Sequence, residues 1–103
     1  MQTLISLFPH HSEDQLQQLY DQAIAFLTFD HAVKVIFDGQ QVNSALLQNP
    51  SLKKRFNGLL LYGAEFCALN GHPALQASEL DFDIAQLTPA QLQALISQSE
   101  VLL

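Results

Sequence analysis

The chain has 103 residues, of which 49% are hydrophobic, and its formal net charge at pH 7 is −6. This length allows one domain with a modest core, and the hydrophobic content excludes a disordered chain. No hydrophobic run approaches the roughly 18 residues of a membrane span, and the start lacks the basic residues of a signal peptide. We therefore expect residues 1–103 to form a single domain of a cytoplasmic protein that does not bind membranes.

The four basic residues include a run of three, Lys53, Lys54 and Arg55, against ten acidic residues in the chain. Nucleic-acid binding depends on clustered cations that neutralise phosphates. So small a run predicts a solvated helix face, and we expect no direct nucleic-acid binding by this chain alone.

The first part of the chain predicts a strand, a helix and a second strand. Residues 3–8 form a short hydrophobic run typical of a strand. Ser12 and Gln15 have the spacing of a capping box, and hydrophobic residues at helical spacing continue to about residue 30. Residues 32–37 are β-branched and mostly hydrophobic, so they predict the second strand.

The middle of the chain predicts two short helices and a buried strand. Residues 40–47 have helical character, which ends before Pro50 because the residue preceding a proline is disfavoured in a helix. Ser51 has the chemistry to cap a second helix, which we expect to stop at Gly63. Residues 64–69 form a hydrophobic run that indicates a strand covered on both faces.

The last part of the chain predicts three short elements and one well-marked helix. Residues 73–78 predict a short helix and residues 82–84 an edge strand. Thr88 and Pro89 mark a sharp helix start, since threonine caps helices and proline is favoured at the first helical position. Residues 99–103 predict a closing strand.

Strand-like and helix-like segments thus alternate along the chain. This alternation implies β-α-β crossovers and a mostly parallel sheet. We predict an α/β fold, specifically a three-layer α/β/α sandwich with a mainly parallel sheet of four to five strands.

Polar residues follow the first three predicted strands: His10, His11, Asp38, Asn70 and His72. Open parallel sheets bind ligands at the edge where the carboxyl ends of the strands meet. Three histidines and a carboxylate could in principle hold a metal ion there, but no two of these groups have ligand spacing on one helix. Ordinary turn and loop chemistry explains the same residues, so we assign no metal and no cofactor. A small-ligand or metal-binding module at this edge stays an alternative.

Several enzyme classes are excluded by motif. The sequence has no glycine-rich phosphate loop, no G-x-S-x-G nucleophile elbow and no H-E-x-x-H zinc motif. A phosphoacceptor receiver domain would need paired acidic residues after its first strand, where this chain has His10 and His11.

Four segments in order carry a resemblance to a known family. They are the first strand with its helix, VIFDGQQV at residues 35–42, LLLYGAEFCAL at residues 59–69 and LTPAQLQALISQSEVLL at residues 87–103. In this order and spacing the chain resembles the DsrE/DsrF-like sulfur-relay proteins, and it is most similar to their TusC/DsrF branch. The likeness covers nearly the whole chain.

The resemblance implies a domain that assembles into trimers or hexamers and, in several bacteria, passes persulfide sulfur along a relay, towards 2-thiouridine in tRNA or within sulfur oxidation. The implied partners are further copies of the chain or DsrE/TusD- and DsrH/TusB-like subunits. Active subunits of the family carry a nucleophilic cysteine just after the third strand, where a helix N-terminus stabilises the thiolate. The matching position here is near Asn70. Cys67 lies three residues earlier and matches a cysteine of the TusC-like branch that is not the sulfur acceptor.

Cys67 is the only cysteine, so neither a disulfide within the chain nor a site of several thiolates is available. Free cysteine is among the most buried residue types, and neither sequence neighbour of Cys67 is a cation. We therefore expect an unreactive Cys67 and a non-catalytic TusC/DsrF-like subunit. The alternative is a sulfurtransferase that uses Cys67 as its catalytic persulfide carrier and His72 as a proton partner.

Overall fold

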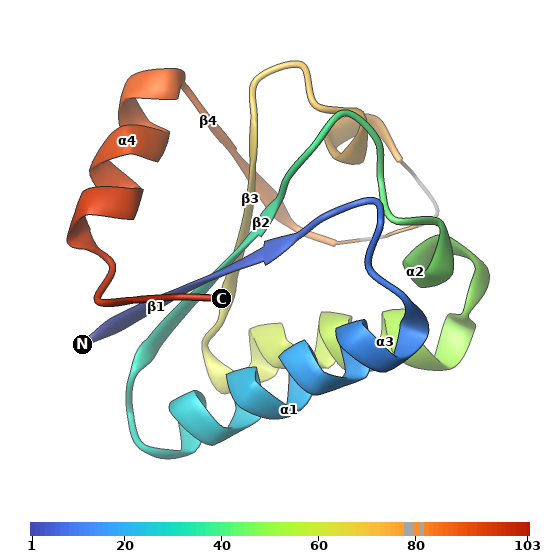
Figure 1. The fold of residues 1–103 in the computed structure, drawn as a ribbon, viewed down its shortest axis with the longest axis horizontal. Coiled ribbons are helices and arrows are strands. Elements are labelled where there is room, and N and C mark those ends of the chain that lie inside the picture. The colour runs from blue at the N-terminus through green and yellow to red at the C-terminus, as the bar shows by residue number, and fades with distance from the viewer. Residues whose placement is uncertain (78–79, 81) are drawn as a thin grey trace.

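The structure, a computed structural model, describes residues 1–77, 80 and 82–103. Five strands form one sheet in the order β4-β3-β2-β1-β5, and every neighbouring pair is parallel (Figure 1). The predicted α/β fold with its mainly parallel sheet is confirmed. The elements in chain order are β1 (Gln2–Leu7), α1 (Glu13–Thr28), β2 (Ala32–Phe37), α2 (Ser44–Gln48), α3 (Pro50–Gly58), the 3-10 helix η1 (Leu59–Tyr62), β3 (Glu65–Leu69), the 3-10 helix η2 (Pro73–Gln76), β4 (Ile84–Leu87), α4 (Pro89–Gln98) and β5 (Val101–Leu102).

Two hydrophobic clusters lie on opposite faces of the sheet. Val35 and Phe37 of β2 belong to the larger cluster, whereas Ile36 between them belongs to the smaller one. Successive side chains of a strand point to opposite faces, so the clusters are separated by the sheet. Residues of α1, α2 and α3 complete the larger cluster, and Leu95 of α4 completes the smaller one (Figure 1). Helices therefore cover both faces, and among the described residues α4 is the only helix on its side.

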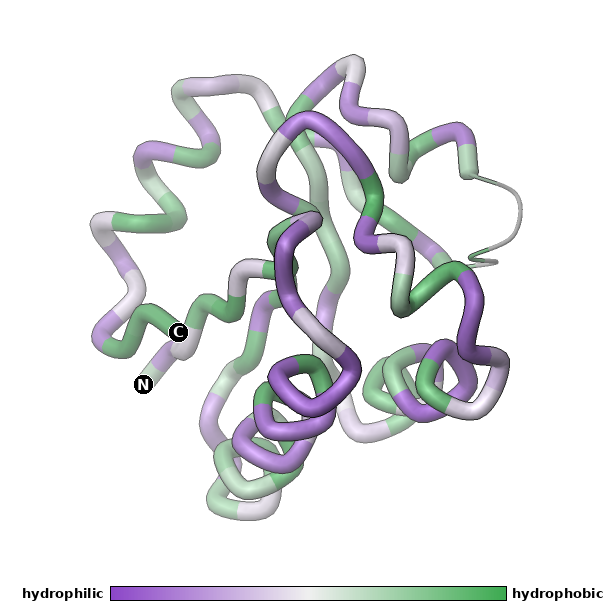
Figure 2. Tube along the Cα trace, turned by 45° about the vertical axis from the view of Figure 1, so that its right-hand side comes forward, coloured by the Kyte–Doolittle hydropathy of each residue, from purple (hydrophilic) through white to green (hydrophobic). Residues whose placement is uncertain are grey.

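Hydropathy follows this arrangement along the chain. Hydrophobic segments run through the middle of the molecule, while the turns of the helices alternate between hydrophobic and hydrophilic residues (Figure 2). Within the part of the chain that the structure describes, no helix has both the length and the hydrophobicity needed to span a membrane.

Side-chain caps fix the beginnings of the two longest helices. Ser12 Oγ accepts a hydrogen bond from the backbone N of Gln15 at 3.2 Å, and Gln15 Oε1 accepts one from the N of Ser12 at 2.8 Å. Thr88 and Gln91 form the same reciprocal pair before α4. Both predicted starts are confirmed.

Two other predicted helix starts were wrong. The helix predicted from residue 40 is α2, which begins later because Asn43 caps it by accepting from the backbone N of Leu46 at 3.0 Å. The following helix, α3, begins earlier than predicted because its cap is Asn49 and not Ser51. Asparagine and serine are about equally good caps, so sequence preference alone did not separate them.

The edge strand predicted at residues 82–84 was placed too early, since β4 begins only at Ile84, the last of these residues. Phe82 packs instead into the larger cluster. Its ring centroid lies 4.9 Å from that of Phe66 and 6.0 Å from that of Phe37. A partly buried aromatic side chain in a loop explains the hydrophobic signal that suggested a strand.

The remaining short elements differ from the sequence prediction in extent. The helix predicted at residues 73–78 is the 3-10 helix η2, and residue 78 lies outside the described residues. The closing strand predicted at residues 99–103 is β5, which pairs with β1 over two residues. The helix predicted to stop at Gly63 ends as an α-helix at Gly58, and Gly63 ends the following 3-10 helix η1, with a φ of +98° that suits glycine.

Candidate functional site

The loops that follow β1 and β2 lie against each other at the carboxyl edge of the sheet. Gly39 has a φ of +84°, and a Cβ at this position would lie 2.6 Å from Cδ of Pro9. Only glycine fits a backbone that is both left-handed and this close to its neighbour. The side chain of Asp38 turns back on the same loop, where its Oδ1 accepts from the N of Gly39 at 2.7 Å.

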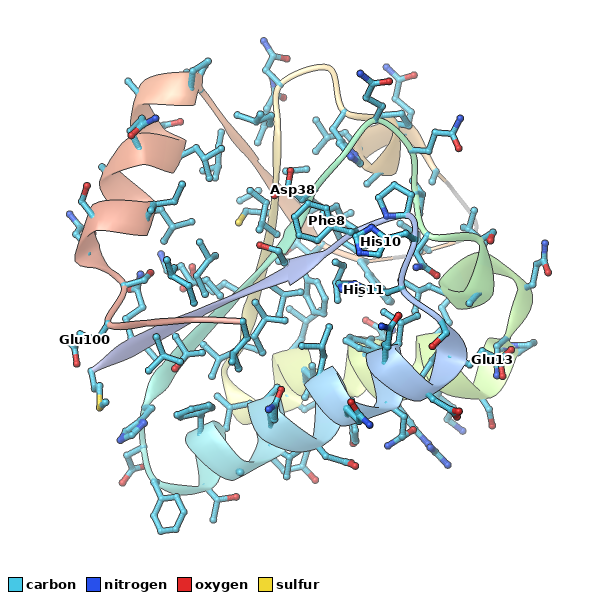
Figure 3. All side chains as sticks on the ribbon, in the orientation of Figure 1. Phe8, His10, His11, Glu13, Asp38 and Glu100 are labelled. Atoms are coloured by element: carbon cyan, nitrogen blue, oxygen red, sulfur yellow. The ribbon has the colours of Figure 1, made fainter. Side chains whose placement is uncertain are left out.

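Three rings gather just after β1 (Figure 3). The ring centroids are 5.3 Å apart for Phe8 and His10, 5.7 Å for Phe8 and His11 and 4.8 Å for the two histidines. The backbone N of Phe8 donates to Nδ1 of His11 at 3.1 Å, which requires that nitrogen to be unprotonated. Burial lowers the pKa of His11, and the neighbouring His10 lowers it further. His11 therefore acts as a neutral acceptor in the loop.

A buried asparagine that the sequence analysis did not single out holds these loops together. The side-chain amide of Asn43 donates to the carbonyl oxygens of Phe8 and His11 at 2.8 Å each, and to that of Pro9 at 3.4 Å. Its Oδ1 serves at the same time as the cap of α2. An asparagine before a helix signals the cap, but the contacts with the other loop depend on the tertiary fold.

Asn70 and His72 are engaged in the turn after β3. The backbone N of Asn70 donates to the carbonyl of Leu87 at 2.8 Å, and its side-chain oxygen accepts from the amide of Gln86. His72 is buried, and its Nδ1 accepts from the N of Ala74 at 3.0 Å, so it caps η2. Its Nε2 is buried and has no hydrogen-bond partner among the described residues.

The carboxyl edge does not gather the predicted polar residues into one metal site. His10 and His11 are adjacent, whereas Asp38 and His72 each form hydrogen bonds within their own turns. Among residues 1–77, 80 and 82–103, no group of three or more His, Cys, Asp or Glu side chains could hold a metal ion. The hydrogen bonds of these residues stabilise the loops at this edge.

Cys67 lies on the α4 side of β3, in the smaller hydrophobic cluster. Its side chain is 4% exposed, and its Sγ donates a weak hydrogen bond to the carbonyl of Val35 at 3.6 Å. Burial raises the pKa of the thiol to about 11, with a smaller opposing effect from Lys34 and a smaller raising effect from Glu65. Since the thiolate is the nucleophile and a thiol with this pKa is almost entirely protonated at neutral pH, little of the reactive form is present.

No protein-family model matches this chain, and no curated protein matches it. The resemblance to the sulfur-relay family thus rests on the order and spacing of its own segments, chiefly residues 35–42, 59–69 and 87–103.

Proposed function

We propose that this chain is a non-catalytic, TusC/DsrF-like subunit of a cytoplasmic sulfur-relay assembly. The burial and raised pKa of Cys67 support the non-catalytic role. A persulfide carrier needs a thiolate that a sulfur donor can reach. Here the only thiol is 4% exposed with a pKa of about 11, and the position expected to carry the family's nucleophile lies near Asn70, whose backbone N is hydrogen-bonded to Leu87 of β4.

Exposed hydrophobic residues support the assembly. Met1, Phe29, Leu61 and Tyr62 are exposed, and each lies in or beside the segment that leads into β1, β2 or β3, so they share the amino edge of the sheet. Leu61 is 90% exposed and Phe29 is 74% exposed. Large exposed hydrophobic side chains concentrated on one part of a surface mark interaction sites. We call these four residues the amino-edge patch and propose that a further copy or a DsrE/TusD- or DsrH/TusB-like subunit covers it.

The proposal is tested by isolating the tagged chain from its native cell at low salt and identifying its partners by mass. We expect a cysteine-bearing DsrE/TusD-like subunit in fixed stoichiometry. Incubation of the complex with a persulfide donor should then add one sulfur atom to the partner and none to this chain.

Matched variants make the assignment specific. Cys67→Ala in this chain should leave sulfur transfer unchanged, whereas replacing the partner's nucleophilic cysteine should abolish it. A stable sulfur adduct on this chain that is lost in Cys67→Ala would replace the proposal with the sulfurtransferase alternative. A monomer without partners would remove the relay assignment altogether.

A further inference from the structure

A cavity of about 240 Å³ lies between α4 and the face of the sheet formed by β2, β3 and β4. Because α4 joins two parallel strands, it runs opposite to them (Figure 1). Its last turn, with Gln98, therefore lies over the beginnings of the strands. There Lys34 of β2 and Glu65 of β3 are neighbours in parallel register and both line the cavity.

One end of this cavity is charged. Lys34 Nζ lies 3.4 Å from Glu65 Oε2, and the two side chains are 34% and 69% exposed. An ion pair this open to water contributes little to stability, so each charge is free to exchange its partner for a ligand group. Gln98, which lines the same end, carries an amide that can donate and accept hydrogen bonds.

The rest of the wall is mostly apolar. It is formed by the polar residue Gln91, whose Oε1 accepts from the N of Thr88, and by six apolar residues, Phe66, Cys67, Ala85, Leu87, Ala94 and Leu95. The small side chains of α4 and β4 leave the space open, because no second helix covers this face of the sheet within the described residues. At about 30 Å³ per water the cavity has room for about eight waters, and so for a ligand of on the order of ten heavy atoms.

We propose that this cavity binds a small zwitterion, namely an α-amino acid with a hydrophobic side chain such as leucine. Its carboxylate pairs with Lys34, its ammonium group pairs with Glu65, and its side chain lies against Leu87 and Leu95. The chain carries a net charge of −6, which repels an anion but not a ligand without net charge. A simple carboxylate bound to Lys34 would be repelled by the neighbouring Glu65, and a simple amine bound to Glu65 would be repelled by Lys34. The proposal does not depend on the sulfur-relay assignment.

Titration of isotopically labelled protein with L-leucine, followed by NMR, tests the site. We expect saturable shifts at Lys34, Glu65 and Ala94. Isocaproate retains the side chain and carboxylate but lacks the ammonium group, and isoamylamine lacks the carboxylate. Each should bind at least about tenfold more weakly than leucine, because one charge of the pair is then left unmatched. Equal binding by either probe, or no saturable shift with leucine, overturns the proposal.

Two pairs of variants locate the ligand. Ala94→Trp fills the cavity, whereas Ala90→Trp places the same side chain on the same helix at an exposed position outside it. Lys34→Met removes the cation, and Lys54→Met is its control on the exposed face of α3. We expect the first member of each pair to weaken leucine binding about tenfold or more and the control to bind like the wild type. If Ala94→Trp does not fold, the leucine affinity of Lys34→Met is the deciding measurement. Unchanged leucine binding by Lys34→Met contradicts the proposal.

Discussion

Asn43 combines two duties in one buried side chain, since it caps α2 and bonds the carbonyls of the loop after β1. We expect Asn43→Ala to lower the free energy of unfolding by about 1–3 kcal/mol, because it removes a cap and takes from the carbonyl of His11 its 2.8 Å hydrogen bond, whereas the carbonyl of Phe8 keeps the backbone N of His11 as a donor. Urea denaturation measures the change. Asn57→Ala on the exposed face of α3 is the control and should change stability by less than about 0.5 kcal/mol. Similar effects of the two substitutions would show that the loop does not depend on Asn43.

Because the pKa of Cys67 is raised in the folded protein, the stability of the fold depends on pH in the alkaline range. The thiol titrates at about 11 in the folded protein against a reference value of 9.0, so the unfolded chain loses this proton first. The neutral thiol therefore makes its full contribution to the free energy of unfolding below pH 9, and this contribution is lost as the pH rises through 11.

The difference in unfolding free energy between the wild type and Cys67→Ala isolates this contribution. We expect the wild type to be more stable by about 1 kcal/mol near neutral pH, because the variant removes a buried side chain, and the difference to shrink above pH 9. Thiol labelling of the native wild type should be slow at pH 7 and fast in denaturant. Rapid labelling of the native protein would mean that the sulfur is reachable as thiolate.

Among the connecting elements, the turns after β2 and β3 both use a left-handed glycine but differ in their surroundings. Gly39 and Gly71 have φ values of +84° and +86°, yet only Gly39 has a neighbour, Pro9, within contact distance of an added Cβ. Gly71→Ala should cost about 1–2 kcal/mol of stability from backbone strain alone. Gly39→Ala should cost at least about 1 kcal/mol more, because the added methyl group also displaces Pro9. Equal losses of stability in thermal denaturation would mean that the loop of Pro9 moves away from Gly39 easily.

The helices differ in how firmly they are anchored. In α4 only Leu95 is buried, whereas α1 buries Leu16 and Ala23 and packs further residues against the larger cluster. We expect the backbone amides of α4 to exchange with solvent faster than those of α1, because local opening of α4 exposes less hydrophobic surface. Hydrogen exchange followed by NMR measures this. The variant Thr88→Ala should accelerate exchange in α4 and leave α1 unchanged, and equal protection of the two helices would contradict the expectation.

Elements whose signals are local were predictable from the sequence. The capping boxes at Ser12 and Thr88 involve residues three apart, and β2 was predicted with its observed bounds because its β-branched run is continuous. The misplaced β4 has a different cause, since the hydrophobicity of Phe82 reflects ring packing against strands far away in sequence.

The same distinction applies to the sites. Burial of Cys67 was predictable from its place in a hydrophobic strand, whereas its lack of reactivity stays a prediction. The cavity under α4 could not be foreseen, because it depends on the register that sets Lys34 beside Glu65 and on the path of one helix across the sheet.

For the whole molecule, the amino-edge patch predicts association. We expect Leu61→Ser combined with Tyr62→Ser to shift the protein towards the monomer, or to release its partner subunit, with little change in thermal stability, because both side chains are already exposed. Light scattering and co-purification measure this. Leu102→Ser, at an exposed hydrophobic residue of β5, is the control and should leave association unchanged. Loss of association in the control alone would move the interface to the β5 edge.

The strand order has a consequence for how fast the domain folds. Every strand pair is parallel, so each pairing closes a long loop, and the pair β1–β5 brings Thr3 beside Val101. Loop closure must precede the contacts that offset its entropy, which slows folding of such topologies. Until β5 docks, the hydrogen-bonding edge of β1 stays open to other chains. Refolding yield should therefore fall as protein concentration rises, even where the native domain is stable.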